Sequence, residues 1–132
     1  MKKLEILQAA LVSVALMAFS AANAETMSKA DYKAGKSRIS ADYKADKSAC
    51  SAQAGNAKDI CVQEAKAKEK VARAELEYAY TGKSSDHNKV LVTKAKTAYS
   101  VARERCDDHS GNARDVCIKE AQAVETKTLA DI

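Results

Sequence analysis

CSAQAGNAKDIC, residues 50–61, begins and ends with cysteine, and a second version of this stretch, CDDHSGNARDVC, occupies residues 106–117. The two stretches contain all four cysteines of the chain. Glycine adopts the left-handed conformation that ends a helix without a steric penalty, and asparagine is a preferred N-cap. Each stretch therefore predicts a helix that stops at Gly and restarts at Asn, which makes a helical hairpin. The alternative is one unbroken helix, which tolerates a glycine at a cost of about 1 kcal/mol.

The cysteines stand symmetrically about this turn, since Cys50 and Cys61 are equally far from the Gly55–Asn56 bond. In an unbroken helix their Cα atoms would be about 16 Å apart, whereas a disulfide requires about 4.4–6.8 Å. Two antiparallel helices bring them level with each other. The sequence thus predicts local disulfides, Cys50–Cys61 and Cys106–Cys117. The two pairings that join the repeats would require both turns to meet at one end of a bundle.

The other residues of the turns have predicted roles as well. Asn56 is expected to be the N-cap of the second helix, with Asp59 at N3, where a carboxylate meets free backbone N–H groups. The second turn repeats the same set, Gly111, Asn112 and Asp115.

The two stretches belong to a longer duplication. DYKADKSAC, residues 42–50, aligns with AYSVARERC, residues 98–106, and GNAKDICVQEAKA, residues 55–67, aligns with GNARDVCIKEAQA, residues 111–123. We therefore expect an all-α domain of two stapled hairpins, about residues 28–80 and 85–132, either bundle-like or elongated.

A shorter repeat inside the first unit supports helices. ADYKAGKSRIS, residues 30–40, is followed at once by ADYKADKSACS, residues 41–51. Eleven residues make three helical turns, so equivalent side chains return to one face. The predicted elements are a helix from Ser28 to about Ala54, a helix 57–80, a linker 81–88 with Gly82 as stop and Ser85 or Asp86 as cap, a helix 87–109 and a helix 113–130. The tyrosines, Tyr32, Tyr43, Tyr78, Tyr80 and Tyr99, are expected to pack between helices.

The N-terminus has the three parts of a secretory signal peptide. Lys2 and Lys3 precede an apolar run at residues 9–19, and Ala22-Asn23-Ala24 supplies a cleavage site. We expect residues 1–24 to be removed and residues 25–132 to form the mature domain in a bacterial periplasm or outside the cell. An uncleaved N-terminal anchor is the alternative, but the apolar run is shorter than the roughly 20 residues of a membrane span.

Composition favours long helices with a small core. The chain has no Pro and no Trp, and 30% of its residues are charged, with a net charge of +4. The charges are mixed in sign along the sequence, without a concentrated basic patch. We therefore expect no nucleic acid partner, and no transmembrane span after signal cleavage.

No catalytic or cofactor-binding motif is present, so no enzyme activity, cofactor or metal is predicted. The C-x10-C spacing differs from the C-x2–4-C spacing of zinc sites. His87 and His109 are expected to be surface or capping residues.

The motif C-x4-G-N-A-[KR]-D-[IV]-C-x2-E-A, present twice after the export signal, resembles a group of small exported proteobacterial proteins rich in Ala and Lys. They are often labelled TolA-like or cell envelope biogenesis proteins. The resemblance implies a periplasmic helical protein.

The expected function is a structural or protein-interaction role in the cell envelope, with a protein partner or an oligomer. A periplasmic holdase chaperone is the alternative. A thiol-based metal or redox-responsive protein is the third hypothesis.

Overall fold

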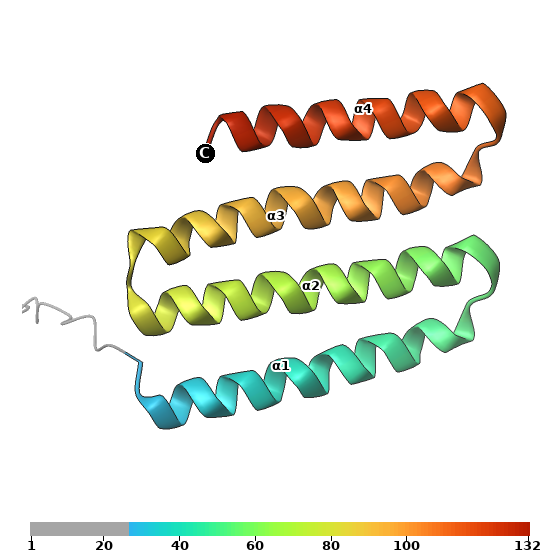
Figure 1. Ribbon diagram of the computed structural model, residues 1–132. Coiled ribbons are helices and arrows are strands. Elements are labelled where there is room, and N and C mark those ends of the chain that lie inside the picture. Colours follow the sequence, from blue (N-terminus) through green and yellow to red (C-terminus); the bar gives the residue numbers. More distant parts are fainter. Residues whose placement is uncertain (1–26) are drawn as a thin grey trace, which may run out of the picture.

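The computed structural model describes residues 27–132, which form four antiparallel α-helices (Figure 1). No strand occurs in this range. The helices are α1, Lys29–Ala49; α2, Gly55–Thr81; α3, Ser84–Arg105; and α4, Gly111–Ala130. The predicted all-α fold of two disulfide-stapled hairpins is confirmed. The predicted signal peptide, residues 1–24, lies outside the described residues.

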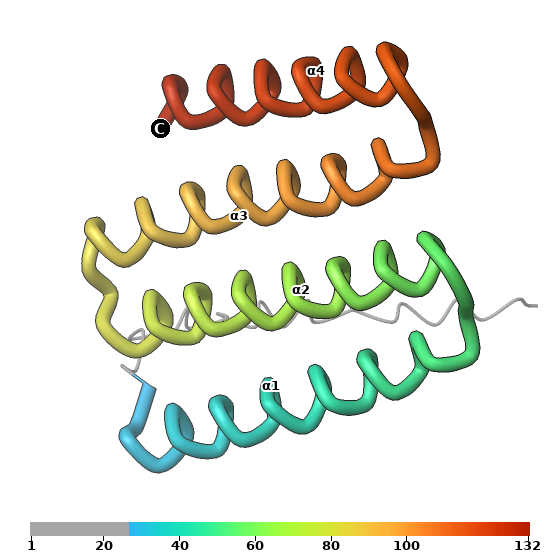
Figure 2. Tube along the Cα trace, turned by 45° about the vertical axis from the view of Figure 1, so that its right-hand side comes forward, coloured from blue at the N-terminus to red at the C-terminus, as the bar shows by residue number. Residues whose placement is uncertain are grey.

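The helices lie side by side in chain order, and the contacts between helices are essentially those of neighbours in sequence (Figures 1 and 2). The interface between α2 and α3 is the most extensive, and α1 and α4 are the two edges. The molecule is thus an open layer one helix thick. A helix in such a layer is covered on two sides at most, so the described core is small: Cys50, Ala65, Val90, Ala95 and Cys106. No helix within residues 27–132 is both long and apolar enough to cross a bilayer.

The first helix starts where the sequence predicts. Ser28 is the N-cap, and its hydroxyl accepts a hydrogen bond from the Asp31 N–H at 3.0 Å. The same hydroxyl donates to the Asp31 carboxylate at 2.6 Å. These bonds satisfy a free donor of the first turn and fix the direction of α1.

Both hairpin turns have the same backbone geometry. A 3-10 turn, Cys50–Ala52, follows α1. Gln53 and Ala54 are extended, and Gly55 then takes a φ of 57° as the first residue of α2. The second turn repeats this with a φ of 56° at Gly111. The left-handed glycines are confirmed, but each begins the second helix of its hairpin instead of ending the first.

The predicted capping by Asn56 is wrong. Ala54 is the N-cap of α2, without a side-chain bond, and Asn56 lies inside the first turn, where it does not act as the N-cap. Its amide donates instead to the Asp108 carboxylate at 2.7 Å and the Glu104 carbonyl at 3.4 Å. It therefore connects the first hairpin to the end of α3.

The predicted capping in the second hairpin is wrong for the same reason. Ser110 is the N-cap of α4, again without a side-chain bond, so Asn112 lies inside the helix. Asp59 and Asp115 consequently lie beyond N3, and the first turns of α2 and α4 hold no acidic residue.

The connection between α2 and α3 is shorter than the predicted linker 81–88. Gly82 ends α2 with a left-handed φ of 64°, as predicted, and its N–H donates to the Tyr78 carbonyl at 2.8 Å. Only Gly82 and Lys83 separate the two helices. α3 already begins at Ser84, so the predicted cap at Ser85 or Asp86 is wrong.

Asp86 is instead a buried carboxylate in the first turn of α3, with 5% of its surface exposed. It accepts a hydrogen bond from the Thr81 hydroxyl at 2.6 Å and pairs with Lys89 at 2.7 Å. The bonds from Lys89 and Thr81 to the charged form lower the pKa of Asp86. The residue thus holds the end of α2 against the start of α3.

Aromatic packing joins α1 to α2 at the same end of the layer. Tyr32 stacks on Tyr80 with 4.4 Å between ring centroids, and its hydroxyl donates to Glu77. Further along, Leu76 packs directly on Gly35, where a Cβ would meet the Leu76 Cδ1 at 2.8 Å. This close approach explains a glycine in the middle of α1.

Candidate functional site

The cysteines form structural crosslinks. Cys50 pairs with Cys61 and Cys106 with Cys117, each with 5.6 Å between Cα atoms, so the predicted pairing is confirmed. No cysteine is free. Cys50 and Cys106 are 1% and 0% exposed. Each disulfide therefore joins the two helices of its hairpin next to the turn, with one of its cysteines buried.

Within residues 27–132, no group of three or more His, Cys, Asp or Glu side chains is placed so that it could bind a metal ion. His87 is exposed, and its ring lies 5.0 Å from that of Tyr78. His109 is an exposed residue of the second turn.

An apolar groove runs between α3 and α4, and we call it the α3–α4 groove. Its volume is about 450 Å³. The charged residues on its rim are Lys94 and Glu125. Val124 and Ile132 remain 66% and 40% exposed on its α4 side. Small or apolar side chains form its walls: Leu91, Ala95, Ala98, Tyr99 and Ala102 from α3, Ala121 and Val124 from α4, and Ile132 just after α4.

The first hairpin has an equivalent groove between α1 and α2, but it is divided into smaller hollows. Cys106 follows Cys50 by 56 positions, and the same offset relates the two grooves. It places Ile39, Tyr43, Lys68 and Glu69 over Ala95, Tyr99, Val124 and Glu125. At these positions the hollow in the first hairpin measures only about 30 Å³, and a separate hollow of about 280 Å³ lies nearer the Cys50–Cys61 bond.

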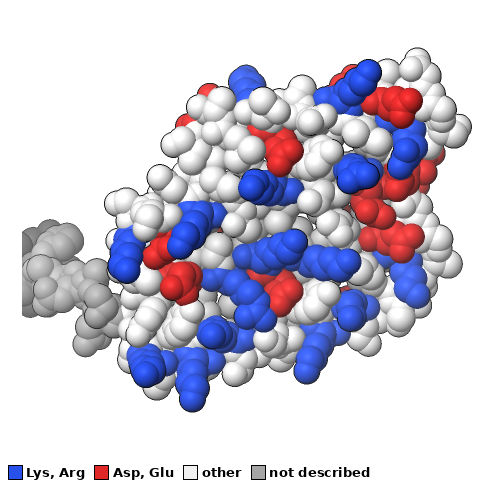
Figure 3. Space-filling model, in the orientation of Figure 1, with Lys and Arg blue, Asp and Glu red and all other residues white. Residues whose placement is uncertain are grey.

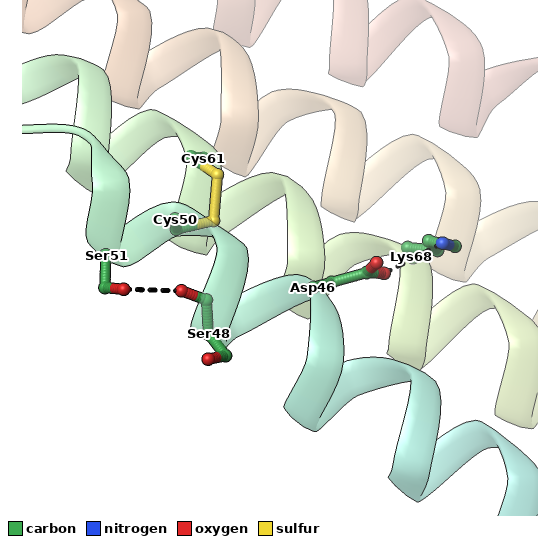
Figure 4. The surroundings of a disulfide bond; sticks show 6 residues. All are labelled: Asp46, Ser48, Cys50, Ser51, Cys61 and Lys68. Atoms are coloured by element: carbon green, nitrogen blue, oxygen red, sulfur yellow. Dashed lines mark hydrogen bonds and ion pairs between the residues drawn. A yellow bond between two sulfur atoms is a disulfide. The ribbon is translucent and has the colours of Figure 1, made fainter.

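An ion pair crosses the first groove. Asp46 from α1 and Lys68 from α2 meet across it at 2.8 Å, beside the Cys50–Cys61 bond (Figure 4). The hydrogen bond to Asp46 raises the pKa of Lys68. At the equivalent positions the second hairpin has Ala102 and Val124, which cannot form such a pair. The duplication has therefore produced one groove that an ion pair crosses and one groove without such a pair.

The structure also separates the charges of the layer by face. Residues two positions apart on a helix point about 200° apart. Asp31 and Asp42 stand two positions from Lys29 and Lys44, so the two signs lie on opposite sides of α1. Figure 3 shows the resulting face, where Lys and Arg side chains predominate over α1, α2 and α3. The prediction of no concentrated basic patch is wrong.

The α3–α4 groove opens on the other face of the layer. Lys94 stands on its rim, whereas Lys96, two positions further, points about 200° away. The two candidate surfaces are thus back to back.

Sequence reasoning missed the groove, although a signal for it was present. Aligning the repeats at the offset of 56 exposes the change from Asp46 to Ala102 and from Lys68 to Val124. Both changes remove a charged side chain, and the two positions face each other across the groove of the hairpin.

Comparisons with family models, with curated proteins and with solved structures find no match for this chain.

Proposed function

We propose that the protein is an exported, non-enzymatic interaction protein of the cell envelope, and that the α3–α4 groove binds an apolar helix of a partner protein. The observation that carries the proposal is the contrast between the two grooves. An ion pair crosses the first groove, which has separate hollows of about 30 and 280 Å³, whereas the second groove is one hollow of about 450 Å³ without such a pair.

The dimensions of the groove suit a helix. From Leu91 to Ala102 the α3 wall spans about 16 Å at a rise of about 1.5 Å per residue, which is three helical turns. Alanines at 95, 98 and 102 allow another backbone to approach closely. An amphipathic helix that lies in an apolar groove is a common mode of peptide recognition.

The rim provides polar contacts beside the apolar floor. Lys94 is paired with Glu75 at 2.6 Å, and both side chains are about half exposed. Glu125 stands on the α4 side. A partner helix with apolar residues on one side and polar residues at its flanks fits this arrangement.

Export is supported by the signal-peptide pattern and by two disulfides, which are compatible with an oxidising compartment outside the cytoplasm. Mass analysis of the secreted protein should then find an N-terminus at Glu25.

The test places the ion pair of the first groove across the second one. The double variant Ala102→Asp with Val124→Lys copies the Asp46–Lys68 pair into the second hairpin. A photo-crosslinking residue at Thr128, which also lines the groove, should capture a discrete partner helix in the wild-type background. The double variant, which we call the closed-groove variant, should give about one tenth or less of the wild-type yield of crosslinked product, and its thermal stability should be unchanged.

The matched control is Asp46→Ala with Lys68→Val, which alters the first hairpin at the equivalent positions. It should leave capture through Thr128 unchanged. Equal capture by the wild type and the closed-groove variant would show that the groove is not the binding site.

The holdase is the second candidate, because Val124 is 66% exposed in an apolar surface that could shelter unfolding chains. Suppression of aggregation of several unrelated clients, lost in the closed-groove variant, would favour it over a specific partner. A thiol-based function ranks third, since both disulfides, with Cys50 and Cys106 buried, would first have to be reduced.

A further inference from the structure

The basic face of the layer begins with a stripe of lysines along α1. Their spacings of three, four and eight residues keep them on one side of the helix. All are exposed, and none forms an ion pair with another residue of the range 27–132. The stripe consists of Lys29, Lys33, Lys36, Lys44 and Lys47.

Two lysines of the stripe are positioned by tyrosine rings. The Lys36 ammonium lies 5.4 Å from the ring centroid of Tyr32, and Lys47 lies 5.6 Å from that of Tyr43. The two pairs are eleven residues apart and therefore repeat one geometry along α1.

The next two helices extend the basic face. Lys66 and Lys70 lie on α2, and Lys96 and Arg103 lie on α3, all exposed and without an ion pair among the described residues. Figure 3 shows Lys and Arg side chains spread over the three helices, with fewer acidic groups between them.

On the opposite face, cations form ion pairs between neighbouring helices. Three of its cations are neutralised by carboxylates from the neighbouring helix: Lys68 by Asp46, Lys94 by Glu75 and Arg105 by Glu64. On the basic face Arg73 pairs with Glu69 and Lys89 with Asp86. The lysines and the arginine named above have no such partner, and they leave an excess of positive charge on that side.

We propose that the basic face binds the surface of a bilayer that contains anionic phospholipids. The cations are spread over three side-by-side helices of a layer one helix thick. They therefore form a broad surface, whose shape suits a flat bilayer better than the narrow backbone of a nucleic acid. Most of these cations are lysines. A lysine acts as a point charge and lacks the bidentate donor geometry with which arginine recognises nucleic acid. Each lysine near an anionic surface improves partitioning about fivefold.

This orientation would leave the α3–α4 groove facing away from the lipid, because Lys94 and Lys96 point in nearly opposite directions. A bilayer and a helical partner could then be bound at the same time. The membrane proposal does not depend on the groove.

The test measures sedimentation of the mature protein with vesicles of phosphatidylethanolamine alone or mixed with about one third phosphatidylglycerol. We expect binding to the anionic vesicles only, lost at high salt because exposed charges are screened. The variant Lys33→Gln with Lys44→Gln should lower the partition coefficient by about 30-fold, from two factors of about five.

The matched control is Arg38→Gln with Lys127→Gln, which removes the same net charge through exposed residues that do not belong to the basic face. It should lower partitioning less than about threefold. Equal losses in both variants would mean that net charge acts without a defined surface. Absence of binding to anionic vesicles, or equally tight binding to duplex DNA, would also overturn the proposal.

Discussion

Asn56 links the two hairpins, because its side-chain amide donates a 2.7 Å hydrogen bond to Asp108 in the 3-10 turn that follows α3. Asn112 stands at the equivalent place in the second hairpin and is exposed, with no side-chain hydrogen bond inside the described range. The same residue type in the same local geometry therefore contributes differently, depending on which helix lies beside it.

Replacing these residues separates their roles. Asn56→Ala should lower the free energy of unfolding by about 0.5–1.5 kcal/mol, the usual contribution of one hydrogen bond. Asn112→Ala should change it by less than about 0.5 kcal/mol, as expected for a surface position. Urea titration of both variants measures the difference. Equal losses would restore the N-cap role for both residues.

Asp86 gives the stability a dependence on pH. Its pKa in the folded protein lies below the ordinary value of 3.8, because Lys89 and Thr81 bond to the charged form. Its contribution is therefore fully present above about pH 4 and is lost as the pH falls through the lowered folded-state pKa.

Asp86→Asn should be less stable than the wild type at pH 7, and the difference should shrink when both are acidified below that pKa. Denaturant titration at the two pH values measures this. Asp59→Asn, at an exposed position, serves as control and should differ little from the wild type at either pH. A difference for Asp86→Asn that persists unchanged in acid would contradict the assigned role of the carboxylate.

Among the four helices, α4 has the fewest contacts with the rest of the molecule. It is an edge helix with one neighbour, and its one ion pair within the described residues, Arg114 with Asp107 at 2.6 Å, reaches only the turn before it. The Cys106–Cys117 bond is thus its main attachment at the turn end.

Removing that bond should release α4 before any other helix. Cys106→Ser with Cys117→Ser should lower the free energy of unfolding by about 3 kcal/mol on the loop-entropy model. Hydrogen exchange should accelerate most within residues 111–130. The corresponding change at Cys50 and Cys61 should spare α4. Uniform acceleration over all four helices would show that the layer opens as one unit.

The helices and staples could be predicted because their signals are local. Ser28 with Asp31 marks a helix start, and the cysteines are symmetric about each turn. The predicted caps at Asn56 and Asn112 are wrong because two extended residues precede each glycine and the helix begins at the glycine, two positions before the predicted start. Nothing in the stretch GN-x-x-D distinguishes these two geometries.

For the whole molecule, the open layer leaves much of every helix in solvent. A compact chain of the mature length has a radius of gyration of about 13 Å. Small-angle scattering of the secreted protein should give a clearly larger value, because four side-by-side helices form a broad plate. A value near 13 Å would mean that α1 and α4 meet and close a bundle.

The layer itself could not be predicted from the sequence. Alanine occurs on several sides of each helix, so no single apolar stripe assigns a neighbour. The order is decided by contacts between distant residues, such as Glu64 with Arg105 and Glu75 with Lys94. The basic face was hidden for a different reason: lysine and aspartate alternate at a spacing of two, which looks balanced in linear order but separates on a helix.

The two edges of the layer make the chain extensible. Ile60 in α2 is half-buried, whereas the equivalent Val116 in α4 is 46% exposed, since no other helix within residues 27–132 covers that side. A third hairpin appended after α4 through a copy of the Gly82–Asp86 connection would find this side unoccupied. The architecture can therefore lengthen by whole hairpins, as repeat arrays do, without altering the units already present.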